Sequence, residues 1–542
     1  MAEPARKLSV SEDRSCVTDS RAVVQGFSAR ELVFAVVGPM GSGPGKIAQI
    51  LNEMLEKNGY DSKIFKASDI IKEWSESNKL IQQSDANETT HLQNEGDRMR
   101  RESGDNAAIG LRFIEKVRHS RGTKLGKDVI DGQPVEPDGN KRAFILDSLR
   151  HPAEVVLLRS VYQDVFCLVG VVCDSHEIRQ KRLKGKIGKG ISDLAIEQMM
   201  ERDEKADEKF GQHVADTFHL ADFFVDNTPE EKKKNGQFND KWTVKETVGR
   251  LVDILTHSKI VRPDPNEAAM FHADGARMRS ACLSRQVGAA LTDRNGNVIA
   301  TGTNEVPRAG GGTYGSCLAD RHNIVGEDHR CFFHGKKCRN TDEQNAIIRD
   351  MLAIVNDTGA LKVDDPLIQK IRKTRIGQLI EFSRAIHAEM DAILSAARQG
   401  ISIIGSKLYV TTFPCHNCAR HIVAAGIDEV QFIEPYLKSR ALPLHGDVIT
   451  TDRDGWNPPS LNKDDASQSL QVLFHSFVGV APRFYRRAFY KDRDLKNSST
   501  GVLLESFGPP EGMGDPSTLR VSYAQMEAHL TAKPSVGTIP NA

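Results

Sequence analysis

Two short runs in the second half of the chain carry residue types that could act together on one substrate. One is His387-Ala388-Glu389, and the other is Pro414-Cys415-His416-Asn417-Cys418. A histidine and two cysteines spaced C-x-x-C supply three protein ligands for Zn²⁺, and catalytic zinc sites leave the fourth position to water. Cys415 and Cys418 lie one helical turn apart, so both thiolates can face one point. The runs therefore predict a catalytic zinc site with His387, Cys415 and Cys418 as ligands.

Glu389 lies two residues from the histidine ligand, where a carboxylate can act as the general acid and base. The pattern H-x-E followed by P-C-x-x-C is the signature of zinc nucleobase deaminases. Zinc lowers the pKa of its bound water to roughly 7, and the hydroxide attacks the ring carbon that bears the amine. Glu389 would carry protons from the water to the ring nitrogen and to the departing ammonia.

A structural zinc knot, or cysteines without metal, is the alternative interpretation. A structural site would offer a fourth protein ligand. His416 falls between the cysteines and should point elsewhere, whereas His421 lies one helical turn beyond Cys418 and stays open as a ligand. Glu389 favours the catalytic interpretation, because a structural zinc site does not need a proton carrier.

The composition describes a chain of several domains without a dominant charge. It has 542 residues, 39% of them hydrophobic, and Lys+Arg and Asp+Glu balance at 73 each. This balance argues against a broadly basic nucleic-acid-binding protein. No apolar run reaches the roughly 18 residues of a membrane span, and the N-terminus lacks the apolar core of a secretory signal. We expect a cytoplasmic protein with no membrane contact.

Hydrophobic patterning predicts two α/β domains. Apolar runs at 32–37, 143–146, 165–172 and 223–225 alternate with helical patterns, as in a doubly wound parallel sheet. A later hairpin, centred on Asp293-Arg294-Asn295-Gly296-Asn297, precedes strands at 408–410 and 430–433. The expected order is a flexible tail, a P-loop-like domain, a linker, a deaminase domain with an insertion at 305–375, and a second flexible tail, over 1–28, 29–258, 259–272, 273–498 and 499–542.

The first apolar run is followed by a glycine-rich turn and then a helical pattern, which is the context of a phosphate-binding loop. The candidate nucleotide-binding residues are Gly38, Gly41, Gly43, Lys46 and Asp147. The loop is imperfect, because Pro44 stands at the lysine position and Gly45 at the hydroxyl position of G-x-x-x-x-G-K-[ST]. We therefore predict a nucleotide-binding or regulatory domain rather than a working kinase. A scaffold without a ligand is the alternative.

The insertion gathers a second set of possible metal ligands, Cys317, Cys331, His334 and Cys338. The spacing of Cys331, His334 and Cys338 suits a structural Zn²⁺ with Cys317 or His329 as the fourth ligand, and such an ion would hold a polar, glycine-rich segment in shape. A loop with free thiols explains the same residues.

Several motifs together resemble a known family. In order along the chain they are Val287-Gly288-Ala289-Ala290-Leu291, Gly302-Thr303-Asn304-Glu305, His387-Ala388-Glu389 and Pro414-Cys415-His416-Asn417-Cys418. They resemble the cytidine and deoxycytidylate deaminase superfamily over about 275–435. With the P-loop-like domain and the runs at 433–439 and 474–482, nearly the whole chain is similar to the bacterial anti-phage dCTP/dCMP deaminases.

This resemblance implies a three-layer α/β/α deaminase domain that converts dCTP or dCMP to the deoxyuridine nucleotide and ammonia, draining dCTP from a replicating phage. It implies that Asn304 holds the sugar hydroxyl, although Asn also suits a turn there. Lys438 is a possible phosphate contact or a surface lysine. We also expect a homo-oligomer and an inhibitor or trigger. The rivals are a deaminase of nucleic-acid bases, a nucleotide kinase or NTPase with a structural deaminase half, and a metal-stabilised binding module.

Overall fold

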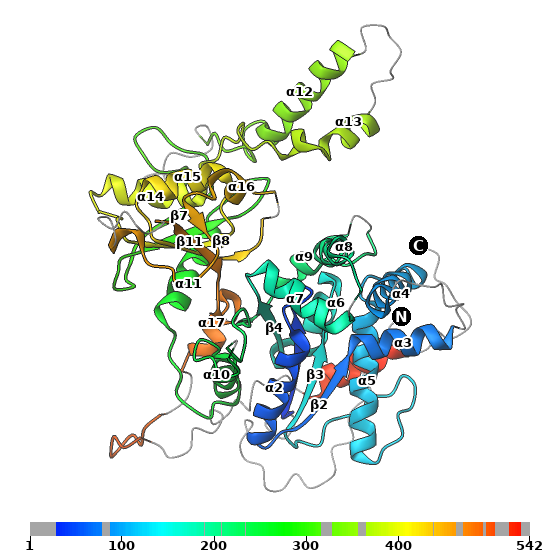
Figure 1. Ribbon diagram of the computed structural model, residues 1–542. Helices are drawn as coiled ribbons and strands as arrows, with labels where there is room; N and C mark the ends of the chain where they lie inside the picture. The colour runs from blue at the N-terminus through cyan, green and yellow to red at the C-terminus, as the bar shows by residue number, and fades with distance from the viewer. Residues whose placement is uncertain are drawn as a thin grey trace.

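Two mixed β-sheets organise the protein. The computed structural model describes residues 29–78, 87–188, 190–206, 209–233, 235–315, 328–355, 365–436, 438–461, 470–491, 495–503 and 520–532. Within these residues there are two six-stranded sheets, with strand orders β12-β5-β4-β1-β3-β2 and β10-β11-β9-β8-β6-β7. Figure 1 shows them side by side, the first with its helices in blue to teal and the second in green to orange.

The N-terminal sheet is the expected doubly wound one. Its parallel strands are β1 (Glu31–Val37), β2 (Asp61–Lys66), β3 (Arg142–Asp147), β4 (Phe166–Val172) and β5 (Phe223–Asp226). Its helices are α2 (Pro44–Lys57), α3 (Ala67–Ser77), α4 (Glu88–Ser103), α5 (Ala108–Leu125), α6 (Pro152–Tyr162), α7 (His176–Ile187), α8 (Asp193–Glu204), α9 (Val214–Phe218) and α10 (Val244–Thr256). Alternate residues of β1 face α2 and α10 on one side and α3, α5 and α6 on the other. Both faces are covered, which explains why β1 is apolar throughout.

The second sheet contains the motifs of the zinc site. Its strands are β6 (Gly288–Thr292), β7 (Val298–Thr303), β8 (Lys407–Thr412), β9 (Glu429–Glu434), β10 (Ile449–Thr450) and β11 (Val472–Ser476). β6 pairs antiparallel with β7 and β8, and the remaining pairs are parallel. Its helices are α11 (Pro265–Arg277), α14 (Ala388–Arg398), α15 (His416–Ala424) and α16 (Ala441–His445).

Two glycines bring helices onto opposite faces of this sheet. A Cβ at Gly288 would lie 1.9 Å from the carbonyl oxygen of Ala273 in α11, and one at Gly302 would lie 2.1 Å from that of Ala388 in α14. Only glycine permits this approach of backbone to backbone. α11 covers one face, while α14 and α15 pack on the other, so the expected three-layer arrangement is observed.

The insertion forms a helical arm. α12 (Arg339–Val355) and α13 (Asp365–Arg372) pack against each other through Ile348, Leu352 and Ile368. In Figure 1 this pair projects away from the rest of the molecule.

The two sheets are joined by one extended segment. β11 belongs to the second sheet, but β12 (Gly479–Val480), three residues later, pairs antiparallel with β5 of the first. Between them Phe477 is buried in a core shared by both domains. α17 (Pro482–Phe489) follows and packs on α10 and α11.

Two expectations about linkers and tails need correction. The linker expected over 259–272 is helical from Pro265, because α11 begins there with Asp264 and Glu267 forming a capping box. Glu267 is fully buried, pairs with Arg250 at 2.6 Å and accepts a hydrogen bond from the backbone N–H of Val480. The connection is thus part of the packed interior and not a flexible joint.

The tail expected to be flexible over 499–542 contains helix α18 (Arg520–Thr531), which packs on α5 and α6. Glu527 of α18 is fully buried and pairs with Arg121 at 2.5 Å, and Arg121 also pairs with Glu31 at 2.8 Å. A buried charge needs a partner of opposite sign, so these residues fix α18 on the N-terminal domain.

Gly479→Ala tests whether the crossing segment stabilises the molecule. Gly479 has φ +112°, and a Cβ there would lie 2.6 Å from Oε1 of Glu267. We expect a loss of about 1–3 kcal/mol from backbone strain and from displacement of the buried carboxylate. The thermal unfolding midpoint measures it. Gly400→Ala is the control, since Gly400 also has positive φ but a Cβ there meets nothing within 4 Å. Equal shifts for the two variants would contradict this role of Gly479.

Candidate active site

The zinc-site residues lie where two helices begin. His387 is the N-cap of α14, and Cys415 is the N-cap of α15, with Cys418 in the first turn. The N-terminus of a helix carries partial positive charge and free N–H groups. Cys415 uses this directly, because its Sγ accepts a hydrogen bond from the backbone N–H of Cys418 at 3.5 Å. Both helix ends therefore favour electron-rich ligand atoms at one point.

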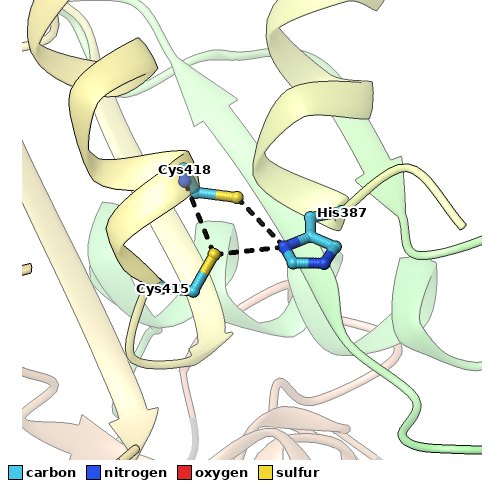
Figure 2. A group of neighbouring side chains, drawn as sticks. All are labelled: His387, Cys415 and Cys418. Carbon is cyan, nitrogen blue, oxygen red and sulfur yellow. Dashed lines mark hydrogen bonds between the residues drawn. The ribbon is translucent and has the colours of Figure 1, made fainter. Parts of the chain in front are cut away.

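The three side chains meet as the sequence predicted. Nδ1 of His387 lies 3.3 Å from Sγ of Cys415 and 3.3 Å from Sγ of Cys418. Figure 2 shows the imidazole entering from α14 while both thiols approach from α15. In the described part of the chain, this is the group of three or more donors close enough to hold one metal ion. Nδ1 is the histidine atom that faces the metal position.

The electrostatics of the group suit a cation. A hydrogen bond involving Cys418 lowers the pKa of the Cys415 thiol, and His387 adds to this effect. Burial alone would lower the pKa of His387, but the neighbouring Cys415 and Glu389 raise it to about 9. Without a metal, these neighbours favour the protonated, positively charged form of the imidazole. A divalent cation can supply that charge instead.

Glu389 lies in the first turn of α14 and is 4% exposed. Burial raises the pKa of Glu389 to about 7. A carboxyl group with a pKa near the working pH can both accept and donate a proton, which is what a general acid and base must do. The structure thus places a proton carrier directly beside the three ligand atoms.

The residues fit a catalytic zinc ion better than a structural one. Nδ1 of His421 donates to the backbone carbonyl oxygen of Asn417 at 2.6 Å, and Nε2 of His416 lies 3.6 Å from Oε1 of Glu381. Neither histidine belongs to the three-donor group. Among the residues that the structure describes, the fourth position is therefore left for water, as catalytic sites require.

A cavity that is open to solvent leads to this group. The residues around it come from both helix starts, the strand ends and α12: Cys282, Ser284, Arg285, Val287, Asn304, Asn340, Ile380, Ser383, Ala385, His387, Ala388, Glu389, Thr412, Phe413, Cys415 and Tyr436. The lining combines apolar and aromatic surface with a few polar groups, which suits a planar base with a polar substituent.

Of the two substrate contacts expected from the sequence, one lines this cavity. Asn304 does so, and its side chain also shapes the rim: Nδ2 donates to the carbonyl of Arg285 at 2.6 Å, and Oδ1 accepts from the N–H of Val287 at 2.7 Å. Lys438 is exposed and is not part of the lining.

Sequence reasoning missed the cationic residue of the cavity, Arg285. Its Nη1 pairs with Oε1 of Glu434 at 2.7 Å, and its guanidinium lies 5.4 Å from the ring centre of Tyr436. Arg285 lies two residues before the Val287-Gly288 motif, and Tyr436 two residues after β9. In the sequence, only their closeness to recognised motifs could have pointed to these two residues, because neither belongs to a distinctive pattern of its own.

The second metal set is not assembled in the described residues. Cys331 and Cys338 line a small cavity together with Cys282, but they form no three-donor group there. The ring of His334 lies 5.4 Å from that of His329. Cys317 lies outside the described residues, so a site that includes it stays a prediction.

The residues of the glycine loop do come together. Gly38, Gly41 and Gly43 lie between β1 and α2, and Asp147 ends the adjacent β3, with its Oδ2 3.2 Å from where a Cβ of Gly45 would be. Burial raises the pKa of Asp147. Lys46 is turned elsewhere: its Nζ pairs with Glu231 at 2.7 Å and lies 4.4 Å from the ring centre of Trp242.

Comparison with known proteins agrees with this site. Residues 264–434 match the cytidine and deoxycytidylate deaminase zinc-binding region. The deoxycytidylate deaminase of Enterobacteria phage T2 is 30% identical over 192 residues, 35% of this chain and 89% of the phage protein. That of phage T4 is 30% identical over 165 residues, 30% of this chain and 73% of the phage protein. The alignment with a solved dCMP deaminase from the cyanophage S-TIM5 covers 40% of this chain and all of the cyanophage chain. Its sequence identity of 19% and TM-score of 0.21 are too low to support a conclusion about this chain.

The second sheet, its helix starts and the three ligands with their buried glutamate define a zinc-binding deaminase domain. Through this domain, the chain belongs to the cytidine and deoxycytidylate deaminase family. The zinc-binding deaminase region that the sequence predicted is thereby confirmed. In the described part of the chain, no helix is long and apolar enough to cross a membrane.

Glu389→Gln separates proton transfer from metal binding. We expect full zinc content and a deamination rate lower by about 10²–10⁴-fold, because the change removes a proton carrier and no ligand. Metal analysis and turnover on the same preparation measure both. Glu343→Gln, the same change at an exposed position of α12, should leave both unchanged.

Alanine at His387, Cys415 or Cys418 should instead lower zinc content and activity together. Substantial turnover in Glu389→Gln would remove Glu389 from the mechanism. Full zinc content in all three alanine variants would refute the ligand assignment.

Proposed function

We propose that this protein hydrolytically deaminates a deoxycytidine nucleotide, dCTP or dCMP, to the corresponding deoxyuridine nucleotide and ammonia. One observation carries the proposal: His387, Cys415 and the buried Glu389 line the same open cavity, and the ligand atom of Cys418 lies within 4.8 Å of those of His387 and Cys415. Phe413, Tyr436 and Val287 line that cavity too and offer apolar surface for a pyrimidine ring. The membership of the family supports a cytosine base as the group that reacts.

The chain's own residues divide the chemistry between them. Zn²⁺, when bound, would hold both cysteines as thiolates and polarise a water at its open position. The carboxylate of Glu389 accepts the proton of that water as its oxygen adds to C4 of the base. The resulting carboxylic acid donates this proton to N3. Glu389 then accepts the remaining proton from the hydroxyl group on C4 and donates it to the amine, so that the C4–N bond breaks, ammonia leaves and C4 becomes a carbonyl carbon.

We propose Arg285 as the residue that meets the substrate's phosphate. It is the arginine of the cavity lining, and its side chain is half exposed at the rim beside Tyr436. A guanidinium binds a phosphate through two parallel hydrogen bonds. A bound phosphate would replace Glu434 as the partner of this guanidinium. Lys438, the candidate from the sequence, lies outside this lining.

Arg285→Gln tests the phosphate contact and the substrate class together. We expect kcat/KM for dCMP and dCTP to fall by about 10- to 100-fold, the effect of losing one charged hydrogen bond worth roughly 1.5–3 kcal/mol. The slow reaction of deoxycytidine should change little. The products formed from dCTP, dCMP, CTP, deoxycytidine and single-stranded DNA, resolved by chromatography, provide the measurement.

Lys438→Ala is the matched comparison, because it removes a cation outside the cavity. A selective loss of nucleotide turnover in Lys438→Ala, with none in Arg285→Gln, would return the phosphate contact to Lys438. Preferred turnover of single-stranded DNA would overturn the free-nucleotide substrate itself.

For the N-terminal domain we propose nucleotide binding with little or no hydrolysis. The support is a glycine loop between a buried strand and a helix, at the carboxyl end of a parallel sheet, where such sheets bind ligands. The loop lacks the lysine and hydroxyl of a working phosphate loop, and Lys46 is engaged by Glu231 and Trp242. We therefore propose that this domain has a regulatory role.

We further propose that the reaction serves defence in the cytoplasm, where loss of dCTP would starve a replicating phage. A homo-oligomer, a second zinc ion in the insertion and an inhibitor or trigger belong to the same proposal. Infected cells carrying the wild type should lose dCTP and gain deoxyuridine nucleotides, as measured by mass spectrometry. Cells with Glu389→Gln should keep dCTP and lose phage resistance, while Glu343→Gln behaves as wild type. Resistance that persists in Glu389→Gln would separate defence from deamination.

A further inference from the structure

The glycine loop is covered by the hairpin of α7 and α8. Met40, in the loop, is 8% exposed and packs its side chain into the apolar interior of this hairpin, against Leu183, Ile196, Met199 and Met200. A Cβ at Gly41 would lie 2.5 Å from the carbonyl oxygen of Arg179 in α7. Loop and hairpin thus touch through both side chain and backbone.

A carboxylate of the protein occupies the position of an anion on this loop. Asp203, in the last turn of α8, is fully buried, and its Oδ2 accepts a hydrogen bond from the backbone N–H of Met40 at 2.7 Å. Its Oδ1 pairs with Nη1 of Arg150 at 2.6 Å. Backbone N–H groups of glycine loops are the donors that hold phosphates. Asp203 therefore uses a donor that a phosphate would need.

The two arginines nearest the loop are engaged in the same closed arrangement. Nη1 of Arg150 also donates to the carbonyl of Gly38 at 3.2 Å. Nε of Arg179 donates to the carbonyl of Met40 at 2.9 Å, while its Nη2 pairs with Glu204 at 2.8 Å. Because Asp203 and Glu204 are adjacent at the end of α8, movement of that end would break the ion pairs of both guanidinium groups together.

A buried hydroxyl inside the loop points independently to a ligand. Ser42 is fully buried, and its Oγ has no hydrogen-bond partner among the residues that the structure describes. This oxygen points across the loop, since a Cβ at Gly38 would lie 2.4 Å from it. Buried polar atoms are nearly always paired, so an unpaired one marks a place for a missing group.

We propose that α7 and α8 form a lid, latched by Asp203 as an internal anion, over a polyphosphate site in the Gly38–Gly43 loop. A polyphosphate, such as the tail of a nucleoside triphosphate, binds only when Asp203 leaves the amide of Met40. Opening frees this amide, Arg150 and Arg179 for the phosphates. The inference rests on the nucleotide-binding role proposed for the N-terminal domain and adds how that role is controlled. The apparent affinity is then set by the fraction of molecules with the lid open.

Removal of the internal anion should expose the site. Inorganic tripolyphosphate is titrated calorimetrically into the full-length wild type, Asp203→Ala and Asp203→Asn. We expect Asp203→Ala to bind about tenfold more tightly, as follows if the open form makes up about 10% of the wild type. Asp203→Asn keeps the shape and loses the charge, so it should fall between the two. Asp193→Asn is the control, because it makes the same change at an exposed residue in the first turn of α8 and should bind like the wild type.

Hydrogen exchange at the amide of Met40 gives a second readout. It should be slow in the wild type and faster in Asp203→Ala. Tripolyphosphate binding by both Asp203 variants that is no tighter than wild type, or slow exchange of Met40 in Asp203→Ala, would overturn the latch. Thermal unfolding checks that each variant is folded. Neither readout involves deamination, so failure of the proposed deaminase reaction would appear separately, as absent turnover in the wild type.

Discussion

The active site depends on two helices whose N-termini lie close together. His387 is the N-cap of α14 and Cys415 is the N-cap of α15, with Cys418 in the first turn, so the backbone at the two helix starts positions all three ligands. Gly302 allows α14 to approach β7 so closely that no other residue type would fit. A larger side chain there would push α14 outward and separate His387 from the cysteines. The chemistry of the site thus rests on packing between a strand and a helix.

The sheet that carries this site is also connected to the N-terminal domain by shared packing and hydrogen bonds. The segment from β11 to β12 leaves one sheet and joins the other, and beside it the buried Glu267 pairs with the partly exposed Arg250. Arg453 pairs with Asp226 at the end of β5 and contacts His475, which in turn bonds Glu429 of β9. Next to Asp226, Asn227 donates to the backbone of the glycine loop at Ser42. A short chain of packed groups therefore joins the loop to the deaminase sheet, so the regulatory role proposed for the first domain has a physical basis.

The sequence revealed those features that local patterns determine. The buried strands β1, β3 and β4 and the hairpin of β6 and β7 follow from apolar runs and turn residues, and the three ligands with Glu389 follow from two motifs. β2, with the polar sequence DSKIFK, and the two-residue β12 carry too weak a pattern to be found. Arg285 and Asp203 were missed for another reason, since their importance arises from contacts with residues far along the chain. The buried position of α18 depends on Arg121 and Glu31, which no pattern near Glu527 reveals.

The most direct test of the account is the coordination of the metal in the full-length protein. Zinc X-ray absorption should be recorded with Cys331 and Cys338 replaced by serine, so that a zinc ion in the insertion does not contribute. We expect two sulfur atoms at about 2.3 Å from the zinc ion and two nitrogen or oxygen atoms at about 2.0–2.1 Å from it. These are Cys415, Cys418, Nδ1 of His387 and a water. A shell with three or more sulfurs, or with none, would contradict it.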